Sequence, residues 1–164
     1  MIQILNSTQI QQRIDRIAYQ VLEDNANEHS IYIAGIVDTG YILAQRIQAA
    51  LEKICSIQIH LLQLKIDKLG QANQHIHLSV ESSELKNKVI IIVDDVLNSG
   101  KTLTYALRPF LDADVKKIRT ILLIDRDHRR YPVHADFVGL RLSTTMKEHI
   151  TVSLEAGEEK VFIS

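Results

Sequence analysis

The chain has 164 residues, of which 46% are hydrophobic and 24% charged, a balance that fits one ordinary globular domain spanning residues 1–164. Its formal net charge of −1 gives no general attraction to nucleic acid or membrane, and no apolar run approaches the roughly 18 residues that span a bilayer. The N-terminal segment lacks the basic and apolar regions of a signal peptide, and Cys55, the only cysteine, excludes an intramolecular disulfide and a cysteine-built zinc site. We therefore expect a cytoplasmic protein without a membrane partner.

Hydrophobic periodicity predicts helices that alternate with strands. In chain order we expect a helix at 7–24 with Asn6 or Ser7 as its N-cap, a strand at 31–36, a helix at 42–51, strands at 56–64 and 74–80, a strand at 89–93, a helix at 103–111, a strand at 118–124, and shorter strands within 135–142 and 159–163. Pro109 is expected to kink the helix in which it lies or to end it early. Such alternation predicts a three-layer α/β domain with a mostly parallel central sheet.

The run VIIIV at 89–93 is apolar at every position, which is typical of a central parallel strand that is covered on both faces. Open parallel sheets bind ligands in the loops beyond the carboxyl ends of their strands. The stretch DDVLNSGKT, residues 94–102, follows this strand and opens the next helix, so it lies where a ligand is expected.

The end of DDVLNSGKT has the Gly-Lys-Thr of a P-loop, but Asp95 replaces the glycine required five positions before Gly100. A phosphorylation receiver domain also has acids at strand ends, yet it needs a third aspartate and a later lysine, and SGKT does not serve it. Residues 98–102 are expected to present backbone N–H groups to one phosphate at a helix N-terminus. Asp94 and Asp95 are suited to accept hydrogen bonds from vicinal hydroxyls or to share a divalent cation. This combination describes a site for ribose 5-phosphate.

The segment VIIIVDDVLNSGKT resembles the phosphoribosyl-diphosphate (PRPP) signature of type I phosphoribosyltransferases, in which apolar residues precede two acids and a Ser/Thr-Gly-x-Thr loop. The resemblance implies that family's three-layer fold with a small base-binding hood. It implies that Asp94 and Asp95 are the catalytic acids, which hold the ribose 2- and 3-hydroxyls with Mg²⁺ close by. It also implies that the 5-phosphate is bound by Val96, Leu97, Asn98, Ser99, Gly100, Lys101 and Thr102.

Nearly the whole chain resembles the bacterial pyrimidine-operon attenuator/uracil phosphoribosyltransferase family, through DRDHRRYPVHADFVG at 125–139 and the tail at 142–164. The resemblance implies a transferase that binds PRPP, a nucleobase and a nucleoside monophosphate, and moves ribose 5-phosphate to uracil with release of diphosphate. It also implies a homodimer or a higher homo-oligomer. Phe137 would stack on the base, and the implied base contacts are Asp125, Arg126, Phe137 and Val138. Asp125 stands where purine-salvage relatives carry a lysine, which favours a pyrimidine.

Two segments depart from the family pattern. The family's diphosphate loop reads Gly-Ile-x-Thr-Arg-Gly, whereas this chain has GIVDTG at 35–40, with Val37, Asp38, Thr39 and Gly40 as the loop. Thr39 replaces the arginine, so PRPP is expected to bind about ten- to a hundredfold more weakly unless Mg²⁺ bridges Asp38. The lid at 65–74 is shorter than in relatives and lacks their tyrosine and arginine. The alternative function is therefore a weakly active or inactive nucleotide-sensing regulator of pyrimidine genes.

Two other groups of residues leave alternatives open. His60, His75 and His77 fit a solvated sheet face, a structural metal site or a pH-sensitive subunit contact. The basic run at 125–132 fits either RNA binding or an ordering role in the base-binding hood, with Arg126 bonded to carbonyls or phosphate.

Overall fold

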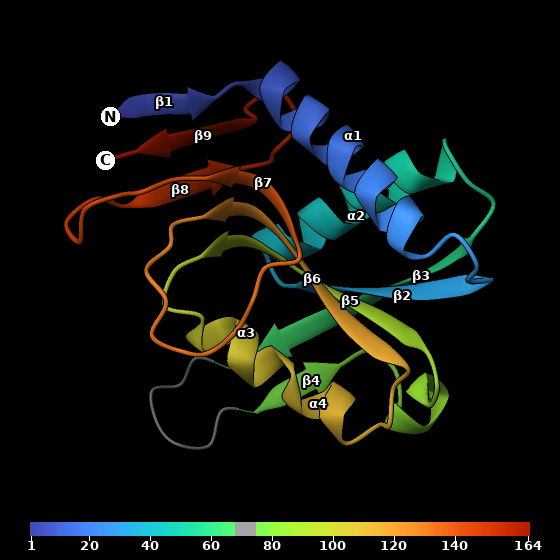
Figure 1. Ribbon diagram of the computed structural model, residues 1–164. Helices are drawn as coiled ribbons and strands as arrows, with labels where there is room; N and C mark the ends of the chain where they lie inside the picture. The colour runs from blue at the N-terminus through green and yellow to red at the C-terminus, as the bar shows by residue number, and fades with distance from the viewer. Residues whose placement is uncertain (68–74) are drawn as a thin grey trace.

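The computed structural model describes residues 1–67 and 75–164. It has a central sheet with helices on both faces and a small second sheet beside it (Figure 1). In chain order the elements are β1 (Ile2–Leu5), α1 (Ser7–Asp24), β2 (Ser30–Ile36), α2 (Thr39–Glu52), β3 (Gln58–Ile66), β4 (Ile76–Leu78), the 3₁₀ helix η1 (Ser82–Leu85), β5 (Val89–Leu97), α3 (Lys101–Ala106), α4 (Arg108–Leu111), β6 (Lys117–Asp125), β7 (Phe137–Arg141), β8 (Ile150–Ser153) and β9 (Lys160–Ile163).

The larger sheet has the strand order β4-β3-β2-β5-β6-β7. Only β4 runs antiparallel to its neighbour, and the other four strand pairs are parallel. The expected three-layer α/β fold with a mostly parallel sheet is therefore confirmed. The arrowheads of β5 and β6 point to the side on which α3 begins and the small sheet lies (Figure 1).

The two faces of the larger sheet pack against different helices. Ile91 and Val93 of β5 belong to a buried cluster that includes the apolar faces of α1 and α2. Ile90 and Ile92 of the same strand belong to a second cluster with α3, α4 and η1. Because successive side chains of a strand point to opposite faces, the all-apolar run at 89–93 fills both clusters.

The helix boundaries largely follow the expected local signals. Asn6 is the N-cap of α1, and it forms a capping box with Gln9 through two hydrogen bonds of 2.8 and 3.0 Å. The helix expected at 103–111 is broken into α3 and α4, with Pro109 in the first turn of α4. A backbone N–H has no helical partner in a first turn, so proline is tolerated there. The expected early end is confirmed.

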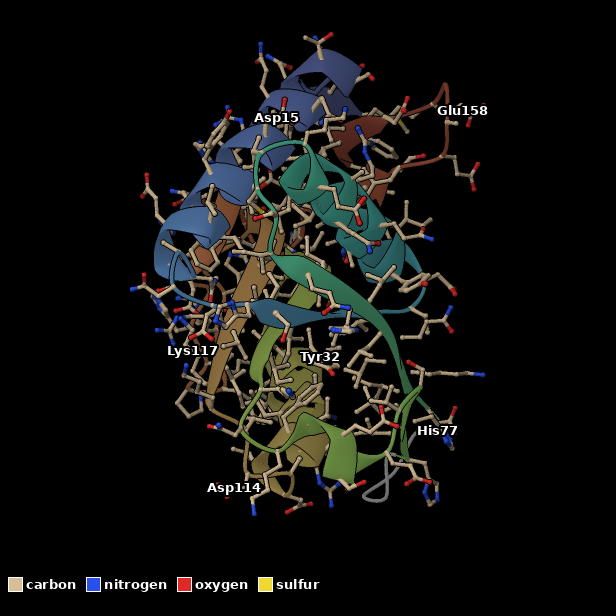
Figure 2. All side chains as sticks on the ribbon, turned by 90° about the vertical axis from the view of Figure 1, so that its right-hand side faces the viewer. Asp15, Tyr32, His77, Asp114, Lys117 and Glu158 are labelled. Carbon is tan, nitrogen blue, oxygen red and sulfur yellow. The ribbon has the colours of Figure 1, made fainter. Side chains whose placement is uncertain are left out.

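The small sheet has the order β1-β9-β8 and is antiparallel throughout. It joins the two ends of the chain, which lie side by side (Figure 1). Glu158, in the turn between β8 and β9, lies at the opposite end of the molecule from Asp114, which follows α4 (Figure 2). Periodicity predicted β9 but not β1 or β8, which have the same length of four residues.

In the part of the chain that the structure describes, no helix combines the length and the apolarity that a bilayer crossing requires.

Candidate active site

The acidic pair lies within the last residues of β5 rather than in a loop after it, since this strand pairs with β6 as far as Leu97 and Asp125. Asp94 is aligned with Leu122 of β6. The Asp94 Oδ1 atom accepts the N–H of Asp95 at 2.9 Å, and the Asp95 Oδ1 atom accepts the N–H of Val96 at 2.8 Å. Both residues are half-buried, so local hydrogen bonds orient the carboxylates while they remain within reach of a ligand.

The predicted phosphate loop forms a hollow of about 50 Å³ together with the first acid. Only residues 98–100 separate β5 from α3. The Ser99 Oγ atom accepts the N–H of Lys101 at 3.3 Å, and Gly100 has a φ of 84°. The hollow is lined by Asp94, Val96, Leu97, Asn98, Ser99, Gly100, Lys101, Thr102, Leu103 and Leu122. The structure thus brings all seven predicted 5-phosphate residues together with Asp94.

The segment after β6 packs against this loop and is hydrogen-bonded to it. The carbonyl oxygen of Ser99 accepts the N–H groups of Arg130 at 2.8 Å and Tyr131 at 3.1 Å. A Cβ atom on Gly100 would lie only 2.6 Å from the Val133 Cγ2 atom. Position 100 therefore requires glycine for two reasons: the backbone is left-handed there, and the Val133 side chain leaves no room for a Cβ atom.

The predicted diphosphate loop lies beside the acidic pair. Val37 and Asp38, joined by a cis peptide bond, connect β2 to α2, and Thr39 is the first residue of the helix. A Cβ atom on Gly40 would lie 2.8 Å from the Val93 carbonyl oxygen and 3.0 Å from the Asp94 Oδ1 atom, so α2 starts in contact with β5.

The N-terminus of this 14-residue helix favours an anion. Asp38 is exposed at the same place and makes no side-chain cap, so its negative charge interacts favourably with the helix dipole but would repel an anionic ligand there.

Asp125, at the carboxyl end of β6, is buried and paired within the protein. Its Oδ2 atom lies 2.5 Å from Arg129 Nη2 and 3.7 Å from Arg141 Nε, and its Oδ1 atom accepts the N–H of Asp127 at 3.0 Å. Two arginines compensate the charge that burial would otherwise penalise. The structure thus gives the Asp125 carboxylate a role in holding the segment that follows β6.

Arg126 is also buried, and its guanidinium is bonded to Asn98 of the phosphate loop and to the turn at 144–148, which precedes β8. The structure shows the bonds to carbonyl oxygens that one of the two alternatives gave Arg126. No residue of this turn was predicted to belong to the site, because neither periodicity nor a motif marks it. Only its place in the tail that resembles the family could have indicated it.

Phe137 and Val138 are the first two residues of β7, and β6 lies between this strand and β5. Phe137 is aligned with Ile121, one residue before the level of Asp94, and it packs against the cluster beneath α1 and α2. The carbonyl oxygen of Val138 accepts a hydrogen bond from Arg16 Nη2 at 2.7 Å. Val138 is aligned with Leu122, the residue of β6 that is also aligned with Asp94, so two strand spacings separate Val138 from the acidic pair.

His75 and His77 lie near each other, with ring centroids 6.5 Å apart, but His60 does not join them. The predicted lid lies mostly outside the described residues, at 68–74. His60 stacks on Tyr32 with ring centroids 4.5 Å apart, whereas His77 lies 3.3 Å from Asp67. Tyr32 and His77 are well separated in Figure 2. Among residues 1–67 and 75–164, no group of three or more His, Cys, Asp or Glu side chains could hold a metal ion.

Comparison with known proteins shows similarity along nearly the whole chain. A family model described as a phosphoribosyl transferase domain matches residues 2–156. The chain is 35% identical over 163 residues to the bifunctional protein PyrR of Macrococcus caseolyticus, with 96% of this chain and 94% of that protein covered. It is 37% identical over 164 residues to the protein of the same name from Staphylococcus saprophyticus, with the same coverage.

Solved structures show the same fold at low sequence identity. The hypoxanthine phosphoribosyl transferase of Trypanosoma cruzi has a TM-score of 0.82 at 14% identity, with 99% of this chain and 90% of that chain covered. A hypoxanthine-guanine phosphoribosyltransferase from Bacillus anthracis has a TM-score of 0.71 at 18% identity, with 87% and 85% covered. The chain therefore belongs to the phosphoribosyl transferase family, in the group of relatives named bifunctional protein PyrR.

Proposed function

We propose that the protein transfers ribose 5-phosphate from PRPP to uracil and releases diphosphate. The observation that carries the proposal is the hollow in which Asp94 and the loop at 98–102 lie together at the carboxyl end of β5. Membership of the phosphoribosyl transferase family supports the reaction class. The choice of a pyrimidine rests on Asp125, because its carboxylate, paired with Arg129, presents no ammonium group to a purine oxygen.

In this reaction the bond between the anomeric carbon and a diphosphate oxygen breaks, and its electron pair leaves with diphosphate. A bond from a base nitrogen to the anomeric carbon forms, and the N–H proton is lost. Positive charge develops at the anomeric carbon, so the carboxylates of Asp94 and Asp95 on the ribose hydroxyls would stabilise the transition state. Backbone N–H groups at 98–102 would fix the 5-phosphate, which limits the sugar to one orientation.

The site also fits Mg²⁺. This ion prefers oxygen ligands, and one or two protein carboxylates with substrate phosphates and water commonly complete its coordination. Asp94 and Asp95 supply such carboxylates at the end of β5, and the exposed Asp38 supplies another beside α2. When bound, the ion would neutralise charge on the diphosphate as it leaves.

We assign the base to the space beside Asp125, Arg126 and the turn at 144–148, because Arg126 links this turn, which leads into the small sheet, to Asn98 of the phosphate loop. The role of Phe137 and Val138 is tested separately. If Phe137 stacks on the base, Phe137→Ala will raise the KM for uracil and leave the KM for PRPP unchanged.

The test of the proposal is UMP formation from uracil and PRPP. Asp95→Ala is expected to lower kcat/KM at least ten- to a hundredfold, since a charge-assisted hydrogen bond contributes about 1.5–3 kcal/mol. Asp112→Ala removes an exposed carboxylate after α4 and is expected to leave the rate unchanged. Wild-type protein that turns over neither uracil nor another common base would overturn the proposal.

A second candidate function is a nucleotide-sensing regulator that binds RNA. The diphosphate loop carries Asp38 where a cation would help PRPP, and a basic surface lies elsewhere. Arg13, Arg16 and Arg141 line a hollow of about 400 Å³ along β7, which also contains Asp136. Partial burial and the charge of Arg13 lower the pKa of Arg16, so these cations are crowded and an anion would be favourable.

Within the basic run at 125–132, by contrast, Arg126 and Arg129 are bonded inside the protein. Tight UMP binding without turnover would favour the regulator. In that case Arg13→Ala is expected to weaken RNA binding and to lower its logarithmic salt dependence by about one unit. Binding that ignores salt would contradict a phosphate-backbone contact. Sedimentation would test the homo-oligomer that the resemblance implies.

A further inference from the structure

Arg126 carries a positive charge at a buried position, since only 7% of the residue is exposed. A buried charge is tolerated when the surrounding groups compensate it. Its guanidinium donates from Nη1 to Asn98 Oδ1 at 2.8 Å and from Nε to Thr144 Oγ1 at 3.0 Å. It also donates from Nη2 to the carbonyl oxygens of Thr145 at 3.3 Å and Glu148 at 2.5 Å. One side chain therefore spans two segments that are far apart in the sequence.

The two segments belong to different parts of the site. Asn98 is the first residue of the phosphate loop, whereas the turn at 144–148 leads directly into β8 of the small sheet. The turn has further bonds of its own. His128 Nε2 lies 2.6 Å from the carbonyl oxygen of Thr144, which can only accept a hydrogen bond, so this nitrogen carries the proton. The Glu148 carboxylate accepts the N–H of Thr145 at 2.5 Å. These hydrogen bonds hold the turn together, so Arg126 can position it as a unit.

We propose that Arg126 is a positioning residue that couples the phosphate loop to the turn at 144–148, so that binding of ribose phosphate stabilises the base side of the site. The inference rests on the proposed function. A planar guanidinium offers its donors in one fixed fork, so the position of Asn98 and the position of the turn are set by the same group. Coupling of this kind is reciprocal. If ribose phosphate strengthens the binding of a ligand at the turn by some factor, that ligand must strengthen the binding of ribose phosphate by the same factor.

Asn98 makes the coupling testable without disturbing the buried charge. It is exposed, and Asn98→Ala removes one of the two connections while the bonds from Arg126 to the turn remain. Arg126→Lys keeps the charge, but one ammonium cannot reproduce the fork. Arg119→Lys is the matched control, because Arg119 lies on β6, the strand that ends just before Arg126, and binds Asp24, far from both segments.

The experiment is hydrogen exchange with ribose 5-phosphate, a ligand without a base, after calorimetry has established saturation for each protein. The amides of Thr145 and Glu148 report on the turn. In the wild type and in Arg119→Lys we expect the ligand to slow their exchange at least fivefold. In Asn98→Ala and Arg126→Lys we expect no slowing at saturation. In steady-state kinetics, Asn98→Ala should raise the KM for uracil about tenfold with less effect on kcat.

Two results would overturn the coupling. One is ribose 5-phosphate that binds the wild type without protecting the turn, and the other is protection that persists in Asn98→Ala. Either result leaves the transferase proposal intact. By contrast, a wild type that binds neither ribose 5-phosphate nor UMP would overturn the proposed function and the coupling together. If Arg126→Lys does not fold, the comparison of the wild type with Asn98→Ala still tests whether the two segments are coupled.

Discussion

At the scale of single residues, Gly100 and Gly157 form a natural pair. Both have a left-handed backbone, with φ of 84° and 85°. A Cβ atom at Gly157 would meet nothing within 4 Å, whereas at Gly100 it would meet Val133. A side chain at either position is therefore destabilising because the backbone is left-handed, and at Gly100 it would also clash with a neighbouring side chain.

We predict that Gly100→Ala lowers the free energy of unfolding by more than Gly157→Ala does. The left-handed conformation costs about 1–2 kcal/mol for a residue with a Cβ atom in either case. The contact with Val133 adds to this cost at Gly100 and displaces the loop, so the affinity for ribose 5-phosphate should fall as well. Urea denaturation and calorimetry measure the two effects. Equal losses of stability in both variants would show that the Val133 side chain moves aside without lowering the free energy of unfolding.

Asp24, at the end of α1, gives a prediction about pH. Burial alone would raise the pKa of its carboxyl group, but hydrogen bonds and charges from Lys117 and Arg119 lower this pKa below the ordinary value. A lowered folded-state pKa adds stability above the unfolded pKa of about 3.9, and this stability is lost as pH falls through the folded pKa.

Asp24→Asn should therefore lower the free energy of unfolding at pH 7, by at most about 1 kcal/mol because the pairs are partly exposed. The difference from wild type should shrink as the pH falls below about 3.9. Chemical denaturation across this range measures it, with Asp112→Asn as the control. A difference that is constant with pH would exclude the ion pairs as its cause.

At the scale of elements, we expect the connection between β2 and α2 to set the affinity for PRPP. Thr39 opens the helix, and Asp38 is exposed in front of it. We predict that Thr39→Arg raises the affinity for PRPP about ten- to a hundredfold, because it restores a charge-assisted contact. Gln45→Arg adds the same charge at an exposed position further along α2 and should have little effect. Titration calorimetry compares them, and an equal gain in both would indicate only a general charge effect.

The elements that could be predicted are those whose signal is local. The strand at 89–93 is apolar throughout, α1 has its capping residue, and Pro109 marks the break between α3 and α4. By contrast, β1 is stabilised by pairing with β9, which lies at the other end of the sequence. Nothing within four residues of β1 specifies that partner.

The same distinction applies to the site. Asp94 and the phosphate loop are contiguous in the sequence, so one motif predicts them all, and the structure brings them together. The surroundings of Phe137 depend instead on the register of β7 against β6, which aligns it with Ile121. The bonds of Arg126 depend on a turn that begins 18 residues later. Register and distant contacts arise from tertiary packing, which periodicity and motifs do not encode.

At the scale of the whole molecule, the small sheet and the large sheet share one buried cluster. Leu5 of β1 and Val161 of β9 are paired in register, and both belong to the cluster beneath α1 and α2. Ile2, in the same strand, is 68% exposed. The small sheet is therefore expected to unfold together with the large one.

We predict that Leu5→Ala lowers the free energy of unfolding by about 2–5 kcal/mol, the usual cost of removing a buried leucine side chain. Ile2→Ala, the matched change at the exposed position, should stay within about 0.5 kcal/mol of wild type. Denaturation followed by both near- and far-ultraviolet circular dichroism should give one coincident transition for each protein. Two separated transitions in Leu5→Ala would show that the small sheet melts independently.

The pairing of β1 with β9 also sets an order of events during protein synthesis. The ribosome makes β1 well before β9, so the small sheet cannot close until residue 163 has emerged. The strands that carry the acidic pair and the phosphate loop are complete once β6 has emerged, at Asp125. At a synthesis rate of roughly 5–20 residues per second, a nascent chain spends a few seconds with these strands available and the small sheet open. The side of the site that we propose holds ribose phosphate can thus be assembled before the side that would receive the base.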